Sequence, residues 1–408
     1  MARLVVDTAD EAGGRGARWR VVAVALSAPT LGCALGIDGG DMFQMVALEN
    51  LGLDARTIGV GLGFGVLSVP VQLWAARLRL ALAKQRLVWF LLIDALFCWL
   101  LAAIVVVARP GGALATAALA LAVLAEVSLS VLYATAWQPL LSVVLGATGR
   151  QQVNAQARAG ARALMVAVLM GFGLAGETAR VLILVGLGGA AVVLAGITHR
   201  LPFAPTPPTE RPAASSEPGR SLPPGVLRLC ITAGLLTTSA LPLFVTFAHD
   251  VLWPDVNLGI VATAQVAGIV LAGLLWRATA TGLLRRARRA ALVSVGAVAL
   301  LAALRAPVDG AAEGLAVLGA LVLAAGATST VGMSIMELVH RTVDHDSSVR
   351  SLTVFDVVAS TSYQAALAAA GVLVAASVGS TWPVDPYRLY LLAASGAVAG
   401  AVWAGLRT

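Results

Sequence analysis

Charge is scarce in this sequence. Only 12% of the 408 residues are charged and 59% are hydrophobic, whereas a soluble domain carries about 25% charged residues. Four long stretches contain no charge at all, namely residues 57–76, 127–149, 256–276 and 357–384. Each stretch can supply the roughly 20 apolar residues that a membrane-spanning helix needs. The scarcity of charge excludes an ordinary water-soluble fold and predicts an all-α polytopic membrane protein.

Several sequence features are also missing, and each absence excludes a class of membrane protein or a kind of site. The apolar stretches do not alternate with polar residues as barrel strands do, so the spans are predicted to be helices. The three cysteines lie in or beside apolar segments and indicate no disulfide framework. There is no phosphate-binding Gly-Lys-Ser/Thr loop, so nothing suggests ATP-driven pumping. His340 and His345 are five residues apart and do not share a helix face, so we interpret their run as a charged turn and predict no metal or cofactor.

Division of the chain at charges, prolines and glycines predicts twelve membrane-spanning helices. Their approximate bounds are 20–48, 56–77, 87–108, 113–145, 157–176, 180–198, 226–249, 256–277, 289–305, 314–340, 351–378 and 386–406. With a cytoplasmic N-terminus, 23 of the 28 basic residues fall on the cytoplasmic side, as the positive-inside rule requires. The five outside are Arg56, Arg109, Arg180, Arg305 and Arg388. Both termini are predicted to be cytoplasmic.

A segment rich in proline divides the chain into two halves. We predict a cytoplasmic tail over residues 1–19, a six-helix bundle over 20–199, a cytoplasmic linker over 200–225 and a second six-helix bundle over 226–408. The halves resemble each other at an offset of about 200 residues, since Ile58-Gly59 matches Leu258-Gly259. This repeat predicts two pseudo-symmetric bundles that rock about a central site, as in secondary transporters.

The run Glu49-Asn-Leu-Gly-Leu-Asp-Ala-Arg-Thr-Ile-Gly59 resembles the junction of helices 1 and 2 in the major facilitator superfamily (MFS), and residues 250–259 are similar at helices 7 and 8. The resemblance covers nearly the whole chain. It implies twelve helices, of which 1, 4, 7 and 10 line a central cavity. In the loop between helices 2 and 3, Arg77 and later basic residues match the family signature, but Ala76 replaces its acid. The fifth helix lacks the Gly-Pro pair of many proton-driven exporters, so the chain is identified as a divergent member.

Ionisable residues at membrane depth are costly and therefore mark candidate sites. Asp38, Asp41 and Gln44 are spaced to share one face of the first helix, and two neighbouring carboxylates favour proton uptake near neutral pH. The alternative is that Asp38 and Asp41 already lie at the water interface. In the fourth span, Glu126, Tyr133 and Trp137 follow one another at helical spacing. They are a second candidate for proton or substrate contact, or else Glu126 is bonded between helices for packing.

A third set of charges lies near the predicted cytoplasmic face. These candidate gate residues are Arg77, Arg162, Arg277, Glu337, Arg350 and Asp356. They either form ion pairs that break and reform during transport or simply end their helices in water. Asp94, in the third span, is interpreted as a neutralising partner of a nearby arginine or as a functional carboxyl.

These observations together predict a secondary transporter and not an enzyme. We expect it to export a small, moderately lipophilic organic molecule by alternating access with proton exchange, because the candidate cavity residues are mostly amides and aromatics. Uptake of a metabolite is the first alternative, and a membrane-embedded enzyme or scaffold is the second. Lys84 is the single lysine among 28 basic residues, which is typical of a high-GC bacterial gene. We therefore expect a monomer in the bacterial cytoplasmic membrane, with protons, substrate and lipid as partners and no nucleic acid.

Overall fold

The computed structural model describes residues 44–75, 83–121, 123–124, 170–201, 243–275, 282–304, 307–342 and 348–405. These residues are helical apart from short connections, and none of them forms a strand. The prediction of an all-α fold is therefore confirmed for this part of the chain.

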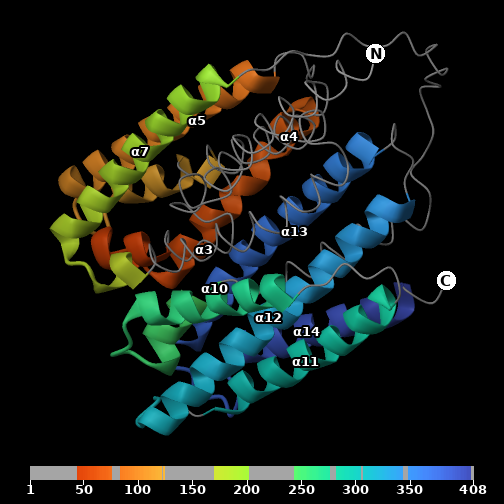
Figure 1. The fold of residues 1–408 in the computed structure, drawn as a ribbon. Helices are drawn as coiled ribbons and strands as arrows, with labels where there is room; N and C mark the ends of the chain where they lie inside the picture. The colour runs from red at the N-terminus through yellow and green to blue at the C-terminus, as the bar shows by residue number, and fades with distance from the viewer. Residues whose placement is uncertain are drawn as a thin grey trace, which may run out of the picture.

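The helices of the N-terminal half follow the predicted spans closely (Figure 1). The first span ends in a π-helical turn, η1 (Val46–Asn50). The second comprises α3 (Ala55–Gly63), η2 (Phe64–Ser68) and α4 (Val69–Ala75). The third is α5 (Ala83–Val107) and the sixth is α7 (Glu177–Arg200), with further helical residues at 113–121 and 170–174.

The C-terminal half repeats this pattern. The seventh span is described from α9 (Phe244–Phe247) into a π-helical turn, η4 (Ala248–Leu252). It is followed by α10 (Leu258–Leu275), α11 (Leu283–Ala303), α12 (Ala311–Thr342), α13 (Ser348–Ser377) and α14 (Pro386–Gly405).

One predicted boundary is wrong by six residues. The ninth span was expected to begin at residue 289, with Arg285 and Arg286 in the preceding loop, but α11 begins at Leu283. The reason is that Leu283, Ala287, Ala290 and Ala291 are buried, and their spacing of three and four residues favours a helix with one packed face. The arginines between them therefore lie in the first two turns of α11.

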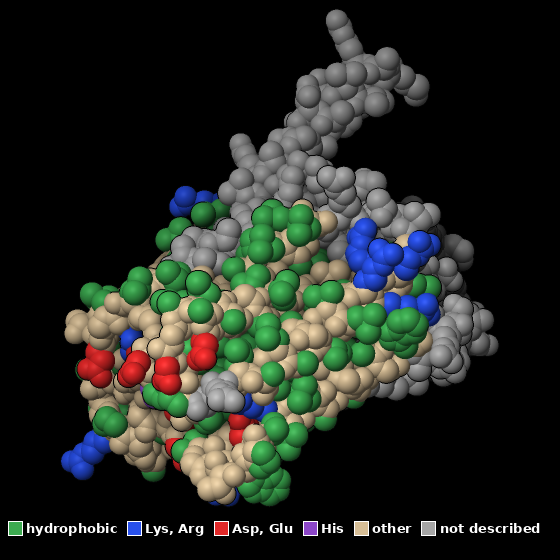
Figure 2. Space-filling model, turned by 90° about the horizontal axis from the view of Figure 1, so that it is seen from below, with side chains coloured by type: hydrophobic (Ala, Val, Ile, Leu, Met, Phe, Trp, Pro, Cys, Tyr) green, Lys and Arg blue, Asp and Glu red, His purple; other side chains and the backbone are tan. Residues whose placement is uncertain are grey.

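The outer surface of the bundle is apolar. Among the described residues, four helices are long and apolar enough to cross a membrane, at Lys84–Val107, Glu177–Arg200, Leu258–Leu275 and Ala311–Ile335. Large hydrophobic side chains on these helices are exposed, with exposed fractions of 74% for Val107, 66% for Leu182 and 79% for Leu275. Green hydrophobic side chains are spread over the face shown in Figure 2. Contiguous exposed apolar surface of this kind needs lipid around it, so the chain is an integral multi-pass membrane protein.

Helix pairs pack closely where glycine removes a side chain. The N-terminal pair is α5 with α7, where Gly188 leaves room for the ring of Trp99, whose Nε1 donates a hydrogen bond to the carbonyl oxygen of Val185 at 3.1 Å. In the C-terminal half α12 packs on both α10 and α11, and α11 packs on α14. Gly268 of α10 lies against Gly326 of α12, where a Cβ on Gly268 would come within 2.9 Å of the Gly326 nitrogen.

The connections predicted to be extracellular meet at one end of the bundle, which we call the junction end. Gly111 N donates to the carbonyl oxygen of Leu51 at 2.7 Å, and Val308 N donates to that of Leu252 at 2.9 Å. These two bonds occupy matching positions in the two halves. At the opposite end, Lys84 Nζ donates to the carbonyl oxygen of Leu201 at 2.5 Å, so α5 and α7 run antiparallel.

Charge is separated between the two ends. Figure 2 shows the acidic side chains gathered toward one end of this face, with a few basic ones among them, and the largest group of basic side chains at the other end. The exposed acids Asp54, Glu177, Asp255, Asp309 and Glu313 all belong to the beginnings of helices at the junction end. Asp54 caps α3 by accepting a hydrogen bond from Thr57 N at 2.8 Å, and its hydrogen bonds to Thr57 lower the pKa of Asp54.

Candidate functional site

The two halves of the chain touch through glycines near the junction end. Gly59, in the second turn of α3, lies against Gly371 of α13. A Cβ on Gly59 would come within 2.8 Å of the Gly371 nitrogen and 2.9 Å of the Leu367 oxygen. One turn further along, a Cβ on Gly63 would come within 2.5 Å of the Ala368 Cβ. Helices α3 and α13 therefore meet backbone to backbone, which only residues without side chains permit.

A second glycine contact relates to the first by the internal repeat. Gly259, which matches Gly59 in sequence, lies in the first turn of α10 and against Gly173 of the N-terminal half. A Cβ on Gly173 would come within 2.5 Å of the Gly259 nitrogen. Asn257 holds this contact, because its Nδ2 donates to the Gly173 oxygen at 2.9 Å and its Oδ1 accepts from Gly259 N at 3.0 Å. The two repeated glycines thus each contact the other half.

Gln44 and Thr246 form a hydrogen bond between the two halves. Both residues are fully buried. The Gln44 Oε1 accepts from Thr246 Oγ1 at 3.0 Å and from Thr246 N at 3.2 Å. Helix α9 begins after Leu243, which adopts a left-handed conformation with φ of 59°, so the N–H of Thr246 has no helical partner of its own. Gln44 therefore caps a helix of the opposite half.

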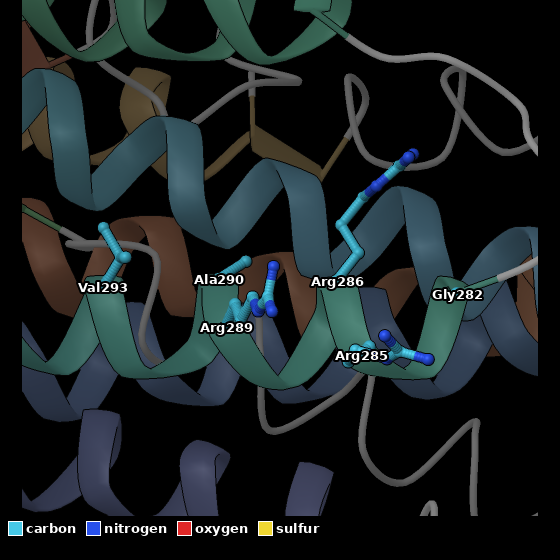
Figure 3. Close-up of a pocket in the computed structure, with 6 residues that line it drawn as sticks. All are labelled: Gly282, Arg285, Arg286, Arg289, Ala290 and Val293. Atoms are coloured by element: carbon cyan, nitrogen blue, oxygen red, sulfur yellow. The ribbon is translucent and has the colours of Figure 1, made fainter.

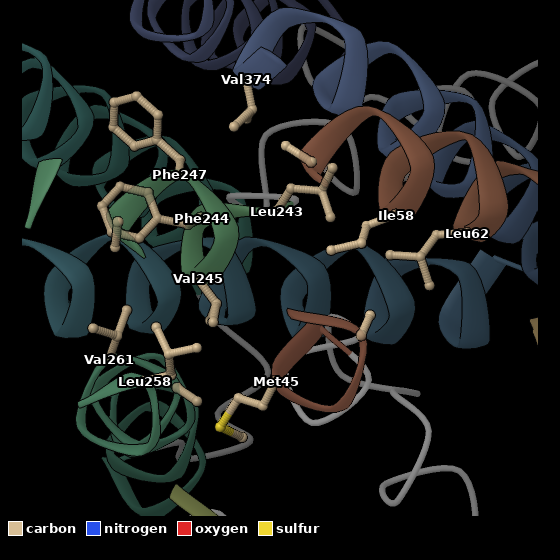
Figure 4. Close-up of a cluster of buried hydrophobic side chains, with 14 of the residues drawn as sticks. Met45, Ile58, Leu62, Leu243, Phe244, Val245, Phe247, Leu258, Val261 and Val374 are labelled. Atoms are coloured by element: carbon tan, nitrogen blue, oxygen red, sulfur yellow. The ribbon is translucent and has the colours of Figure 1, made fainter. Parts of the chain in front are cut away.

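Apolar side chains from both halves surround this hydrogen bond (Figure 4). Met45, Ile58 and Leu62 come from the N-terminal half and belong to the same buried cluster as side chains of α9, α10 and α13. In Figure 4, Met45 lies beside Leu258 and Ile58 beside Leu243. The C-terminal members are Leu243, Phe244, Val245, Phe247, Leu258, Val261 and Val374. We call these residues, with Gln44, Thr246 and the four glycines, the junction. All the apolar members are buried, so the described residues of the two halves pack tightly together at the junction.

Buried arginines brace the helix ends on either side of the junction. Arg180, in the first turn of α7, forms an ion pair with Glu49 and lies 3.5 Å from Asn50 Oδ1. Its Nε donates to the Phe172 oxygen at 3.2 Å, and its guanidinium lies 5.7 Å from the centre of the Phe172 ring. The arginine therefore ties α7 to η1, the end of the helix that carries Gln44.

Arg388 has the matching role in the C-terminal half. It lies in the first turn of α14, pairs with Asp385 at 2.6 Å, and donates to the carbonyl oxygens of Leu304 and Ala302. Its guanidinium lies 5.7 Å from the Phe247 ring of α9. Asp385 also caps α14, accepting from Arg388 N at 2.9 Å. Both arginines thus support the short helical segments that meet at Gln44 and Thr246.

Comparison with solved structures identifies the fold of this chain. No protein-family model and no curated protein matches the sequence. Among solved structures, a mutant of the nucleoside transporter NupG is similar over 96% of this chain and 100% of its own, with 13% identity and a TM-score of 0.67. A bacterial homologue of the iron transporter ferroportin, outward-facing with soaked iron, covers 97% of this chain and 99% of its own at 14% identity and a TM-score of 0.61.

A bacterial homologue of the human lysosomal transporter Spinster, inward-facing and unoccupied, matches 97% of this chain and 91% of its own, with 14% identity and a TM-score of 0.51. All three have the same architecture. The chain has the major facilitator fold. The fold expected from the resemblance at residues 49–59 is thereby confirmed.

Within the major facilitator fold, only part of the predicted site falls on described residues. Gln44 is described, and it lies in the junction with its amide bonded to Thr246. The candidates outside the described residues are Asp38, Asp41, Glu126, Tyr133, Trp137, Arg77, Arg162 and Arg277. Glu337 lies in α12, and Arg350 and Asp356 lie in α13, but their side chains are not described. Their assignment to substrate, proton or gate remains a prediction.

The sequence analysis missed Arg180 and Arg388 as site residues. It counted both among the basic residues on the outer side and gave them no further role, although their side chains are only 10% exposed in each case. The available signal was their position, because each stands in the first turn of the last helix of its half, on the side where the positive-inside rule disfavours arginine. A buried arginine retained there needs an acidic partner, and Glu49 and Asp385 supply one each.

Asp94 is the one carboxyl of the described residues that lies deep within a span. It is 3% exposed in the middle of α5, and its Oδ2 has no hydrogen-bond partner among the described residues. No arginine in that part of the chain pairs with it, so the expected neutralising partner is not found there. Within the same residues there is also no group of His, Cys, Asp and Glu side chains that could hold a metal ion.

Proposed function

We propose that this chain is a divergent MFS member that exports a small, moderately lipophilic organic molecule across the bacterial cytoplasmic membrane by alternating access, in exchange for protons. The observation that carries the proposal is the junction. Two glycine contacts related by the internal repeat, Gly59 with Gly371 and Gly173 with Gly259, join the halves near the same end. A contact built twice from equivalent residues is suited to open and close by rocking of the two halves.

The charge distribution supports an orientation for this cycle. Arginines gather at the end opposite the junction and exposed acids gather at the junction end. By the positive-inside rule, the junction end is extracellular. The closed junction then corresponds to the inward-facing stage of the cycle, in which a cytoplasmic substrate enters.

The proposed substrate class follows from the candidate cavity residues. Gln265 and Gln364 are each 6% exposed, and one amide atom of each has no hydrogen-bond partner among the described residues. With the predicted Tyr133 and Trp137, they offer hydrogen bonds and aromatic faces without net charge. Such a lining suits an uncharged or weakly charged organic molecule better than a phosphate or polycarboxylate.

Transport by purified protein in liposomes is the test of this function. Compounds that raise its unfolding temperature in a thermal-shift screen are the substrates to use. We expect counterflow of the bound compound, and accumulation against its gradient when a pH gradient is imposed. Hydrolysis or group transfer without flux would support an embedded enzyme, and binding without flux a scaffold. Lower intracellular accumulation in a strain that lacks the gene would support uptake instead of export.

Proton coupling makes a separate prediction for the membrane carboxyls. At least one of the variants Asp38→Asn, Asp41→Asn and Glu126→Gln should lower pH-driven accumulation of the substrate by tenfold or more. Counterflow of the substrate should continue in that variant, because counterflow needs no net proton movement. Glu177→Gln is the matched control, since this exposed acid lies at the start of α7. Unchanged pH-driven transport in all three variants would remove these residues from the proton path.

A further inference from the structure

A pocket lined by arginines lies at the end of the bundle opposite the junction. It has a volume of about 450 Å³ and is lined by Gly282, Arg285, Arg286, Arg289, Ala290 and Val293, which belong to the N-cap and the first half of α11 (Figure 3). In Figure 3 the three arginine side chains leave the helix in different directions around this space. The transport cycle proposed above assigns no role to it.

The first two turns of α11 contain four arginines and no acidic residue of their own. Arg285 and Arg289 are exposed and one helical turn apart, where like charges repel. The first turn contains no acidic residue, and the N-cap is Gly282, which has no side chain to cap the helix. The positive end of the helix dipole adds to the repulsion. Among the described residues, no carboxylate forms an ion pair with Arg285 or Arg289, so a bound anion would relieve this excess charge.

The pocket continues into an apolar, outward-facing strip on the same helix. Leu292, Val293 and Leu300 are 54%, 47% and 45% exposed. From Arg289 to Leu300 the helix rises about 16 Å at 1.5 Å per residue, which is about the depth of one leaflet of the hydrocarbon core. Arginines therefore stand at the level of the headgroups, and the apolar strip runs alongside the acyl chains.

An aromatic residue marks the same membrane level. The Arg288 guanidinium lies 5.1 Å from the centre of the Trp403 ring, near the end of α14, and Trp403 is 43% exposed. Tryptophan favours the boundary between headgroups and hydrocarbon. This places the arginine pocket beside lipid headgroups and not deep in the aqueous phase.

We propose that this pocket binds the headgroup of an anionic phospholipid, with the phosphate held by Arg285 and Arg289 and one acyl chain lying along Leu292, Val293 and Leu300. Basic pockets at the cytoplasmic ends of membrane helices are suited to such headgroups. The lipid would neutralise the repelling arginines and fix the tilt of α11 and of α14, which packs against it.

Lipid binding to the purified full-length protein tests the proposal. Native mass spectrometry with phosphatidylglycerol and with phosphatidylcholine gives the lipid preference, and we expect phosphatidylglycerol to be retained preferentially. At about 1 kcal/mol per arginine, the Arg285→Gln, Arg289→Gln double variant should bind phosphatidylglycerol about 30-fold more weakly. The Arg285→Lys, Arg289→Lys variant should retain most of the binding, because it keeps both positive charges. It also shows whether the start of α11 tolerates substitution.

A matched control removes the same charge elsewhere. Arg56 and Arg109 are also exposed, but they lie at the junction end, so their double glutamine variant should bind phosphatidylglycerol as the parent does. Equal losses of phosphatidylglycerol binding in the two glutamine variants would mean a diffuse attraction of the lipid to basic residues, and would contradict a specific site. Equal retention of phosphatidylglycerol and phosphatidylcholine by the parent protein would also contradict it. If millimolar inorganic phosphate displaced the lipid completely, the pocket would be a site for a free anion and not for a phospholipid.

Discussion

Replacement of Gly59 by alanine is expected to force the junction open. The new methyl group would overlap the Gly371 backbone, which cannot move aside as the tip of a flexible side chain can. Overpacking of this kind costs about 1–3 kcal/mol, and here the cost falls only on the closed arrangement. The equilibrium should therefore shift toward the open junction by about 5- to 150-fold, and the transport rate should fall because the inward-facing stage is depopulated.

Labelling of a buried cysteine measures this shift. Val374 is fully buried in α13 near Gly371, so a Val374→Cys reporter, in a background without the three native cysteines, should react slowly with a polar maleimide. Gly59→Ala should raise its reaction rate at least fivefold, and Gly173→Ala should act in the same direction. Gly189→Ala is the control, because nothing lies within 4 Å of a Cβ at that position. Equal reactivity in Gly59→Ala and Gly189→Ala would mean that the glycine contact does not hold the junction.

Replacement of Arg180 by leucine is expected to be among the most destabilising single changes in the described part of the chain. It would leave the Glu49 carboxylate, which is 26% exposed, without its partner, and loss of one member of a buried pair costs about 3–5 kcal/mol. Because Glu49 keeps some contact with solvent, the loss should lie near the lower value. The apparent unfolding temperature in detergent should fall by about 3–5 °C, because in a chain of this length 1 kcal/mol shifts it by little more than about 1 °C.

Two further variants separate the ion pair from general damage. Arg56→Leu removes an exposed arginine at the same end and should change the unfolding temperature by no more than about 2 °C. The Glu49→Leu, Arg180→Leu double variant should be more stable than Arg180→Leu alone, because no charge is then left unpaired. If Arg180→Leu behaved like Arg56→Leu, the brace between α7 and η1 would contribute nothing.

The repeat of Gly59 and Gly259 could be recognised in the sequence, but their contacts could not. Their match at an offset of about 200 residues, next to Ile58 and Leu258, contributed to the prediction of two related halves. The sequence could not indicate what each glycine touches. Gly371 and Gly173 come from helices remote in the chain, and only the packing of the complete fold brings them there.

The start of α11 was not predicted correctly from the positions of its arginines. Counting charges assigned them to a loop, since four arginines within five residues interrupt an apolar run. The helix nevertheless starts at Leu283, because burial of Leu283 and Ala287 outweighs the local repulsion. The spacing to Asp38 and Asp41 singled out Gln44 as a candidate, but it could not indicate the hydrogen bond to Thr246. A contact between helix ends of opposite halves leaves no periodic pattern in the sequence.

The central claim is that the junction opens as the opposite end closes, and paired distances test it most directly. Spin labels at residues 56 and 378 report on the junction end, and labels at 200 and 275 report on the other end; all four positions are exposed. In Gly59→Ala compared with the parent, alternating access predicts a longer 56–378 distance together with a shorter 200–275 distance. If the first pair lengthened while the second stayed fixed or lengthened too, the two ends would move independently and the account would be contradicted.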